Sequence, residues 1–200
     1  MIMNKFHPLT IISVVRLTPD AVAISFDVSN NVLFQFEAGQ YITIKKDIDG
    51  EEVRRAYSIC SMNTEGVTIG VKKVETGKMA TFLTESVKQG DVLQVMPPSG
   101  NGVINGNNKH IVGICAGSGV TPIISMIKTE LAKQSDVKFT LIYGNKTKDS
   151  SMFAEELQQL QIDNSDRLKI HNAYSRQGVA GAINGRLDKN TIQQLLNTFI

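Results

Sequence analysis

The pattern of strand and helix signals changes once along the chain, and this change constrains the fold more than any other feature of the sequence. The first half carries six short segments, rich in β-branched residues and separated by turn sequences, at 9–17, 22–28, 39–45, 55–61, 67–74 and 91–97. Strands at this spacing predict a six-stranded antiparallel barrel. The segment 77–90 instead places its apolar residues at helical spacing, so we expect one helix that caps a mouth of the barrel.

The second half alternates strands with helices. Strands are expected at 110–115, 138–144 and 168–174, and helical patterns follow them at 121–133, 151–161 and 188–197. Ser151, with two glutamates in the turns that follow, marks the expected start of the middle helix. This alternation predicts a parallel sheet with right-handed crossovers. The chain would thus have two domains, 1–102 and 108–200.

Composition argues against several classes of protein. The 200 residues carry a formal charge of only +2, spread along the sequence, which argues against nucleic acid as a partner. No apolar run approaches the roughly 20 residues that cross a bilayer, so we expect no membrane partner. The two cysteines lack metal-binding or redox spacing, and the three histidines are scattered. We therefore predict no metal site and a reduced, cytoplasmic protein.

The segment 111–128 has the pattern of a strand, a loop of small residues and a helix. Gly117 and Gly119 allow a tight turn and the close approach of a ligand, while Pro122 suits the first turn of a helix. Free backbone N–H groups and the helix dipole at such a point form an anion site. However, Pro122 stands where the dinucleotide-binding fingerprint has its third glycine. Taken alone, the loop fits a phosphate cradle and a plain strand-to-helix turn equally well.

Three motifs occur in an informative order along the chain. They are Arg55-Ala56-Tyr57-Ser58, Gly77-Lys78-Met79-Ala80-Thr81 and Gly117-Ser118-Gly119-Val120-Thr121-Pro122. Together they resemble the ferredoxin–NADP⁺ reductase superfamily, with its R-x-Y-S sequence, its glycine-led helix start and its G-[ST]-G-x-[AT]-P loop. Other stretches, such as "VMPPSG", "MFAEEL" and "GRLD", resemble the NADPH-dependent reductase components of phenylacetyl-CoA oxygenase complexes. The resemblance runs from Phe6 to about Leu196 and implies FAD and NADPH as cofactors.

The resemblance implies a role for each residue of the first motif. Arg55 would meet the flavin pyrophosphate, for which a planar, permanently charged guanidinium is well suited. Tyr57 would lie along the isoalloxazine ring, and Ser58 would form a hydrogen bond near flavin N5, the atom that accepts hydride. Thr121 would approach the flavin or the nicotinamide. Tyr57, Ser58 and Thr121 are therefore the expected catalytic residues.

The other implied cofactor contacts come from four segments. The glycine-led helix start would supply a second pyrophosphate contact, although Ala80 stands where the family usually has serine. One strand of the barrel would frame the flavin, mostly through its backbone, and the loop at 117–122 would hold the nucleotide pyrophosphate. Ser175 and Arg176 would grip the 2′-phosphate of NADPH, with Lys146 as a weaker candidate. The residues implied by these segments are Gly70, Val71, Lys72, Gly77, Lys78, Met79, Ala80, Thr81, Gly117, Ser118, Gly119, Thr121, Ser175 and Arg176.

The resemblance implies a flavin-dependent oxidoreductase that passes electrons from NADPH through FAD to an iron–sulfur centre feeding an oxygenase. The sequence contains neither the family's C-G-P strand nor the cysteine cluster of a C-terminal [2Fe–2S] domain. We therefore expect a truncated chain whose cluster lies in a missing domain, with a natural minimal reductase as the alternative. Two other interpretations stay open: a free-standing NAD(P)H:flavin reductase and a non-catalytic flavin- or nucleotide-binding module.

Overall fold

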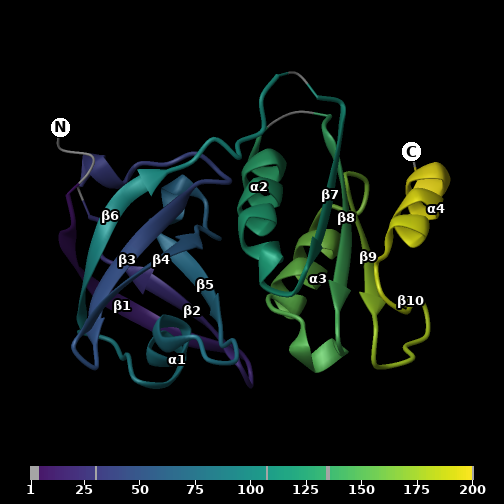
Figure 1. Cartoon of the computed structure of the whole chain (residues 1–200). Coiled ribbons are helices and arrows are strands. Elements are labelled where there is room, and N and C mark those ends of the chain that lie inside the picture. The colour runs from purple at the N-terminus through teal and green to yellow at the C-terminus, as the bar shows by residue number, and fades with distance from the viewer. Residues whose placement is uncertain (1–4, 30, 107, 134–135, 200) are drawn as a thin grey trace.

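The computed structural model describes residues 5–29, 31–106, 108–133 and 136–199, which form two halves lying side by side (Figure 1). The first half is a six-stranded antiparallel sheet that curls into a barrel, with strand order β4-β3-β6-β1-β2-β5. The isolated bridge between Ile59 and Ile69 brings the two edge strands together. The expected barrel is therefore confirmed. Its strands are β1 (His7–Thr18), β2 (Ala21–Phe26), β3 (Tyr41–Ile48), β4 (Glu51–Ser58), β5 (Thr68–Lys72) and β6 (Val92–Ser99).

Strand β4 begins earlier than the sequence pattern suggested because a tight hairpin joins it to β3. Asp49 and Gly50 both have positive φ values, 56° and 77°, as a type I′ turn requires. The side chain of Asp47 accepts a hydrogen bond from the Gly50 N–H at 3.1 Å. The polar start of β4 is thus paired along β3, whose register runs from Ile48 opposite Glu51 to Tyr41 opposite Ser58.

Helix α1 (Lys78–Glu85) lies across one mouth of the barrel, as expected (Figure 1). Its residues Met79 and Leu83 are buried with the isoleucines and valines of the strands, and this burial is what holds the helix in place. The helix is shorter than the predicted segment 77–90. The chain turns at Gly90, which has a φ of 91° and donates its N–H to the carbonyl of Ile11.

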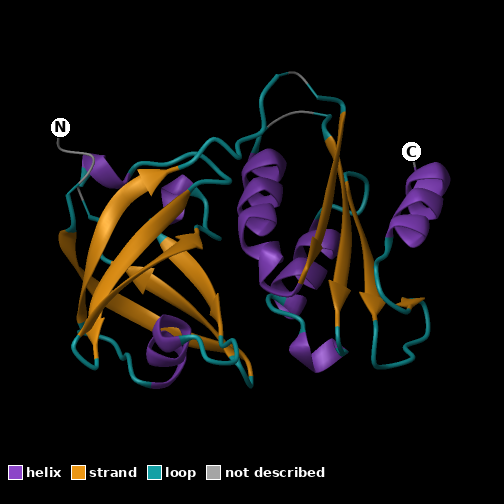
Figure 2. Cartoon of the chain, in the orientation of Figure 1, coloured by secondary structure: helices purple, strands orange, loops and turns teal. Residues whose placement is uncertain are grey.

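The second half is a parallel sheet with strand order β10-β9-β8-β7 (Figure 2). The predicted parallel sheet is confirmed, and the sequence pattern missed only the two-residue strand β10. Its elements are β7 (His110–Ala116), α2 (Val120–Ala132), β8 (Lys138–Asn145), α3 (Ala154–Asp163), β9 (Leu168–Tyr174), β10 (Ile183–Asn184) and α4 (Lys189–Phe199). Single 3₁₀ turns complete the described chain: η1 (Val32–Phe34), η2 (Asn63–Glu65), η3 (Gly117–Gly119) and η4 (Lys148–Ser150).

Helix α3 begins at Ala154, so the predicted start at Ser151 is wrong. The Ser151 hydroxyl donates to the carbonyl of Thr147 instead of capping α3. Phe153 then takes a left-handed conformation, with a φ of 58°, which costs about 1–3 kcal/mol in a non-glycine residue. Burial of its ring, which is 6% exposed, offsets that cost.

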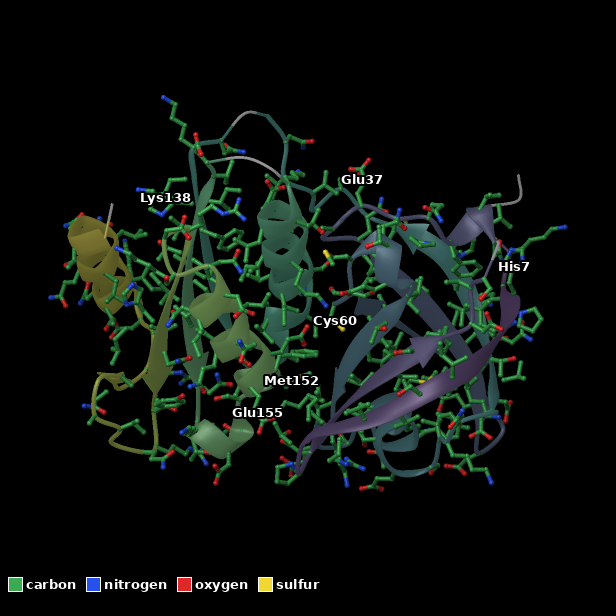
Figure 3. The ribbon with its side chains drawn as sticks, turned by 180° about the vertical axis from the view of Figure 1, so that it is seen from behind. His7, Glu37, Cys60, Lys138, Met152 and Glu155 are labelled. Carbon is green, nitrogen blue, oxygen red and sulfur yellow. The ribbon has the colours of Figure 1, made fainter. Side chains whose placement is uncertain are left out.

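The two halves share buried surface. The core of the second half, built from Val120, Ile124 and Met152 among others, also includes Ala21 and Cys60 of the barrel half. Cys60 and Met152 lie where the halves meet in Figure 3. A common core of this kind joins the halves more firmly than a polar domain contact would.

Candidate functional site

The first cavity, which we call the barrel pocket, has a volume of about 390 Å³. It brings together the end of β4, strand β5, the start of α1 and the loop before α2, which are far apart in the sequence. Most residues expected to bind the flavin line it. They are Arg55, Tyr57, Ser58, Gly70, Lys72, Gly77, Met79, Ala80, Ser118, Gly119 and Thr121, joined by Ala56, Val74 and Pro122.

Two side chains of β4 set the chemistry of the barrel pocket. Arg55 is exposed and donates from Nη1 to the carbonyl of Arg54 at 2.7 Å. Within the described part of the chain it has no carboxylate at ion-pair distance, so its charge is available to an anion. Burial raises the pKa of Tyr57 to about 12, and the charge of Arg55 opposes that rise. The pocket therefore offers a permanent cation beside a neutral aromatic ring, which suits an aromatic ligand that carries phosphate.

The start of α1 adds a second place for an anion. Gly77 is the N-cap residue and has no side chain to accept a hydrogen bond from the helix. The first N–H groups of a helix have no acceptor within it, which leaves those of Lys78, Met79 and Ala80 free to face a ligand. The Thr81 N–H is already used, because it donates to the carbonyl of Gly77 at 2.9 Å.

The second cavity, which we call the sheet pocket, has a volume of about 420 Å³. It lies at the carboxyl ends of β7, β8 and β9, where ligands of open α/β sheets bind. It shares Lys72 and Ser118 with the barrel pocket, so the two cavities adjoin. Its lining residues are Asp20, Lys72, Ala116, Gly117, Ser118, Gly144, Asn145, Lys146, Ser150, Ser175, Gly185, Arg186 and Leu187.

The loop after β7 contributes to both cavities. Gly117 has a φ of 53°, a conformation that favours glycine, and a Cβ on it would meet open space within 4 Å. Gly119 has an ordinary helical φ of −61°, so the loop needs positive φ only at its first glycine. The Tyr143 hydroxyl donates to the Gly117 carbonyl at 3.1 Å and fixes the loop from behind. Burial raises the pKa of Tyr143, so this donor stays protonated.

Asn145 carries a buried donor at the sheet pocket. Its side chain is 9% exposed, and its Nδ2 has no hydrogen-bond partner among the described residues. Burial raises the pKa of Tyr143 and the nearby Asn145 side chain lowers it, yet no hydrogen bond to Asn145 Nδ2 forms. An unpaired buried amide costs about 1–3 kcal/mol. A ligand oxygen in the sheet pocket would remove that cost, which fits a nucleotide there.

Lys72 stands between the cavities and also joins the two halves. Its Nζ donates to the carbonyl of Ser150 at 2.8 Å and lies 3.4 Å from the Asp20 carboxylate. Burial raises the pKa of Asp20, but the hydrogen bond from Thr18 and the charge of Lys72 outweigh it and leave that pKa below its usual value. The positive charge of Lys72 is thus held in place at the wall that the two cavities share.

Four expected residues line neither cavity. The Val71 side chain is fully buried in the barrel core. Thr81 follows the three residues of α1 whose N–H groups have no acceptor within the helix. Lys78 forms an ion pair with Glu51. Arg176 is exposed, and its backbone N–H donates to the carbonyl of Lys146 at 2.9 Å, which places it next to the sheet pocket without lining it.

Sequence reasoning missed several residues of the sheet pocket. Arg186 is an exposed cation of this pocket, and the sequence motifs include it only within the stretch "GRLD". Arg186 follows β10, a strand that the sequence pattern does not indicate, so no local signal pointed to this residue. The other exposed cation is Lys146, which the sequence had already indicated as a weaker candidate. Asp20 belongs to the barrel half, in the turn between β1 and β2, and no local pattern links it to the sheet.

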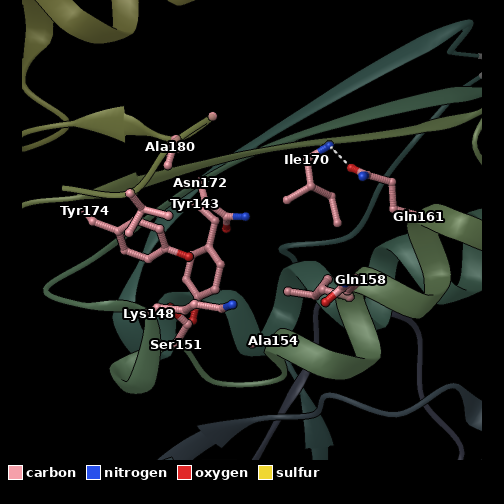
Figure 4. A pocket seen from close by; sticks show the side chains of 14 residues that line it. Tyr143, Lys148, Ser151, Ala154, Gln158, Gln161, Ile170, Asn172, Tyr174 and Ala180 are labelled. Atoms are coloured by element: carbon pink, nitrogen blue, oxygen red, sulfur yellow. Dashed lines mark hydrogen bonds between the residues drawn. The ribbon is translucent and has the colours of Figure 1, made fainter. Parts of the chain in front are cut away.

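A third cavity of about 310 Å³ lies between α3, β9 and the segment 179–182 (Figure 4). None of the expected site residues lines it. The side chain of Gln161 is already engaged there, because its Oε1 accepts a hydrogen bond from the Ile170 N–H at 2.6 Å. Among the described residues, no group of three or more His, Cys, Asp or Glu side chains could hold a metal ion. No helix in the same residues has the length and apolarity to cross a membrane.

Comparison with known proteins agrees with the geometry of the two cavities. Residues 8–103 match the oxidoreductase FAD-binding domain family, and residues 114–198 match the oxidoreductase NAD-binding domain family. The first match covers the barrel, including β4, β5 and α1. The second covers most of the parallel sheet with its loops. FAD and NAD(P)H are therefore the cofactors of these domains.

Two named relatives are similar to most of this chain. The chain is 36% identical to one of the subunits of the 1,2-phenylacetyl-CoA epoxidase of Escherichia coli (strain K12), over 96% of this chain and 56% of that protein. It is 32% identical to the ferredoxin reductase component of 3-ketosteroid-9-alpha-monooxygenase of Rhodococcus rhodochrous, over 87% of this chain and 51% of that protein. The chain thus spans about half the length of these curated relatives.

A ferredoxin NADP⁺ reductase from Neisseria gonorrhoeae, solved with bound FAD and NADP, has the same fold. It superimposes with a TM-score of 0.81 at 21% identity, over 98% of this chain and 81% of that one. The barrel, the parallel sheet and the two matched domains lead to one conclusion: the chain joins a domain of the oxidoreductase FAD-binding family to a domain of the oxidoreductase NAD-binding family, in the fold of ferredoxin–NADP⁺ reductases.

Proposed function

We propose that this chain takes electrons from NADPH through FAD and delivers them to an iron–sulfur centre that serves an oxygenase. The observation that carries the proposal is the meeting of two adjoining cavities, one lined by the R-x-Y-S strand and the other by the strand-to-helix loop at Gly117. Bound FAD would supply the chemistry that this pairing needs, namely hydride acceptance and the release of single electrons.

The residues of the barrel pocket would bind and orient the flavin. Arg55 and the free N–H groups at the start of α1 would hold its phosphates by charge-assisted hydrogen bonds. Tyr57, which stays a neutral phenol, would cover an aromatic face, and Ser58 would offer a hydroxyl near the reacting atoms. Thr121 would contribute its methyl group, because its hydroxyl already donates to the carbonyl of Ser118 at 3.0 Å.

The residues of the sheet pocket would bind the nucleotide that donates the hydride. The Gly117 loop would receive its pyrophosphate, and the Nδ2 of Asn145 would donate to a ligand oxygen. Lys146 and Arg186, with Ser175 and Arg176 beside them, would surround the 2′-phosphate that distinguishes NADPH from NADH.

The oxygenase partner is inferred from the relatives. One of them belongs to an epoxidase for phenylacetyl-CoA, and another is the ferredoxin reductase component of a monooxygenase. We therefore propose a role in the oxidation of phenylacetate or a related aromatic acid. We also infer a cytoplasmic setting, which suits the two free thiols of Cys60 and Cys115.

The proposal is tested by following electrons from donor to acceptor. The purified chain is loaded with FAD, and NADPH oxidation is measured with a [2Fe–2S] ferredoxin or with excess free flavin as acceptor. Faster turnover with the ferredoxin supports the proposal. Turnover with free flavin alone indicates a flavin reductase, and flavin binding without any NADPH oxidation indicates a binding module.

A further inference from the structure

One face of α2 bears small and polar residues, and each of them contacts the barrel half. Thr121, Ser125 and Lys128 are spaced four and three residues apart, so they lie on the same side of the helix. A helix that packs against a partner normally presents apolar residues on that side. The exception indicates that this face makes specific contacts.

The first two contacts are buried. A Cβ on Gly70 would lie 2.6 Å from Thr121 Cγ2, so β5 and α2 approach as closely as a residue without a side chain allows. One turn further along α2, the hydroxyl of Ser125 donates to the carbonyl of Ser61 at 2.6 Å, and the Ser125 side chain is fully buried. Both contacts join segments of the barrel half to the same helix.

Lys128 makes the third contact and joins three elements. Its Nζ lies 2.7 Å from Glu65 in η2 and 3.0 Å from Glu156 in α3, and its side chain is only 14% exposed. Burial lowers the pKa of Lys128, but the two carboxylates more than reverse that effect. Loss of the Lys128 charge would therefore remove the ion pairs that link α2 to η2 and to α3.

These contacts fix the helix that carries the nucleotide loop. The loop lining both cavities runs directly into α2, and Lys128 lies about 10 Å further along the helix axis than Thr121 at 1.5 Å per residue. Anchoring a stiff helix at both points sets its angle against β5. We propose that Ser125 and Lys128 are positioning residues, which hold the sheet pocket at the spacing from the barrel pocket that hydride transfer requires. This inference rests on the proposed function.

The test compares Lys128→Met, which keeps the length of the side chain and removes its charge, with Lys128→Arg, which keeps the charge. Lys133→Met is the matched control, because Lys133 follows the end of the same helix and, within the described residues, its one ion pair is with Glu130 of that helix. Each FAD-loaded variant is examined by amide hydrogen exchange over 61–66 and by the rate of flavin reduction at saturating NADPH. Ser125→Ala is measured in the same way and replaces Lys128→Met if that variant does not fold.

In Lys128→Met we expect amide hydrogen exchange over 61–66 to be about tenfold faster. We expect its bound flavin to be reduced about tenfold to a hundredfold more slowly, because a small misplacement of hydride donor and acceptor can slow the transfer that much. Its FAD affinity and its KM for NADPH should stay within about twofold, and Lys128→Arg should restore both the exchange and the rate. Faster exchange with an unchanged limiting rate would overturn the inference, as would an equal loss of rate in Lys133→Met. If the unaltered chain is not reduced by NADPH, the proposed function itself fails. Hydrogen exchange without cofactor then decides whether Lys128 joins the halves.

Discussion

Gly70 of the flavin-binding half and Thr121 of the nucleotide-binding half are in direct contact, with no room for a side chain between them. The methyl group of Thr121 faces Gly70, and its hydroxyl donates back to the loop through the carbonyl of Ser118. Met152 and Phe153 approach the same glycine from the start of α3. This contact therefore joins β5 to the start of α2, and both elements line the barrel pocket.

Adding one methyl group at that contact should separate the two cavities. Gly70→Ala would place a Cβ 2.6 Å from Thr121 and 3.1 Å from Phe153, and overpacking of this kind costs about 1–3 kcal/mol. We expect a lower melting temperature and slower flavin reduction by NADPH. In the control Gly102→Ala, the nearest atom lies 3.5 Å away, and both quantities should stay close to those of the unaltered protein. Normal reduction by Gly70→Ala would show that the close contact does not matter for function.

Removal of the cation in the barrel pocket should weaken flavin binding without unfolding the chain. Arg55→Ala deletes a charge-assisted hydrogen bond worth about 1.5–3 kcal/mol, which corresponds to roughly a tenfold to hundredfold higher dissociation constant for FAD. Arg54→Ala is the control, since Arg54 is paired with Glu52 at 2.6 Å on the barrel surface. The check is fluorescence titration with FAD, and equal affinity in the two variants would remove Arg55 from the site.

The choice between NADPH and NADH should depend on the cations around the sheet pocket. Arg186 lines that pocket, and Arg176 is bonded through its backbone to Lys146, which also lines it. We expect Arg186→Ala and Arg176→Ala each to weaken NADPH binding about tenfold, with little change for NADH, because each removes a cation that would face the 2′-phosphate. Isothermal titration of both nucleotides to both variants is the measurement. An equal loss for NADPH and NADH would mean that neither arginine recognises the 2′-phosphate.

Both thiols should be unreactive in the folded chain at mildly alkaline pH. Burial raises the pKa of Cys60 and of Cys115 to about 12, and only a thiolate is alkylated quickly. Iodoacetamide at about pH 8, close to the ordinary thiol pKa, should therefore leave both thiols intact, while the chain in urea should be labelled at both. Because these folded-state pKa values lie above the unfolded ones, their contribution to stability is complete below the ordinary thiol pKa and is lost as pH rises toward 12. Rapid labelling of the native chain would contradict the raised pKa values of the two thiols.

The sequence motifs predicted most of the barrel pocket because its residues lie in three short, regular segments. Arg55, Gly77 and Gly119 each lie in one of these segments and line that pocket. The sequence did not predict Asp20 or Arg186 as site residues. Asp20 reaches the sheet pocket through the packing of the two halves, and Arg186 reaches it through the path of the chain after β9. The predicted start of α3 is wrong for a related reason. Phe153 is buried where the halves meet and has a left-handed conformation, which no local propensity indicates.

The most direct test of the central claim is an anaerobic titration of the FAD-loaded chain with NADPH. The claim is that the barrel pocket holds FAD and that the adjoining sheet pocket holds its hydride donor. If so, the absorbance band of oxidised flavin should disappear with one equivalent of NADPH, and Arg55→Ala should retain less flavin at the outset. If the folded chain binds FAD and its band persists with excess NADPH, the two cavities do not form one reducing site, and the central claim is wrong.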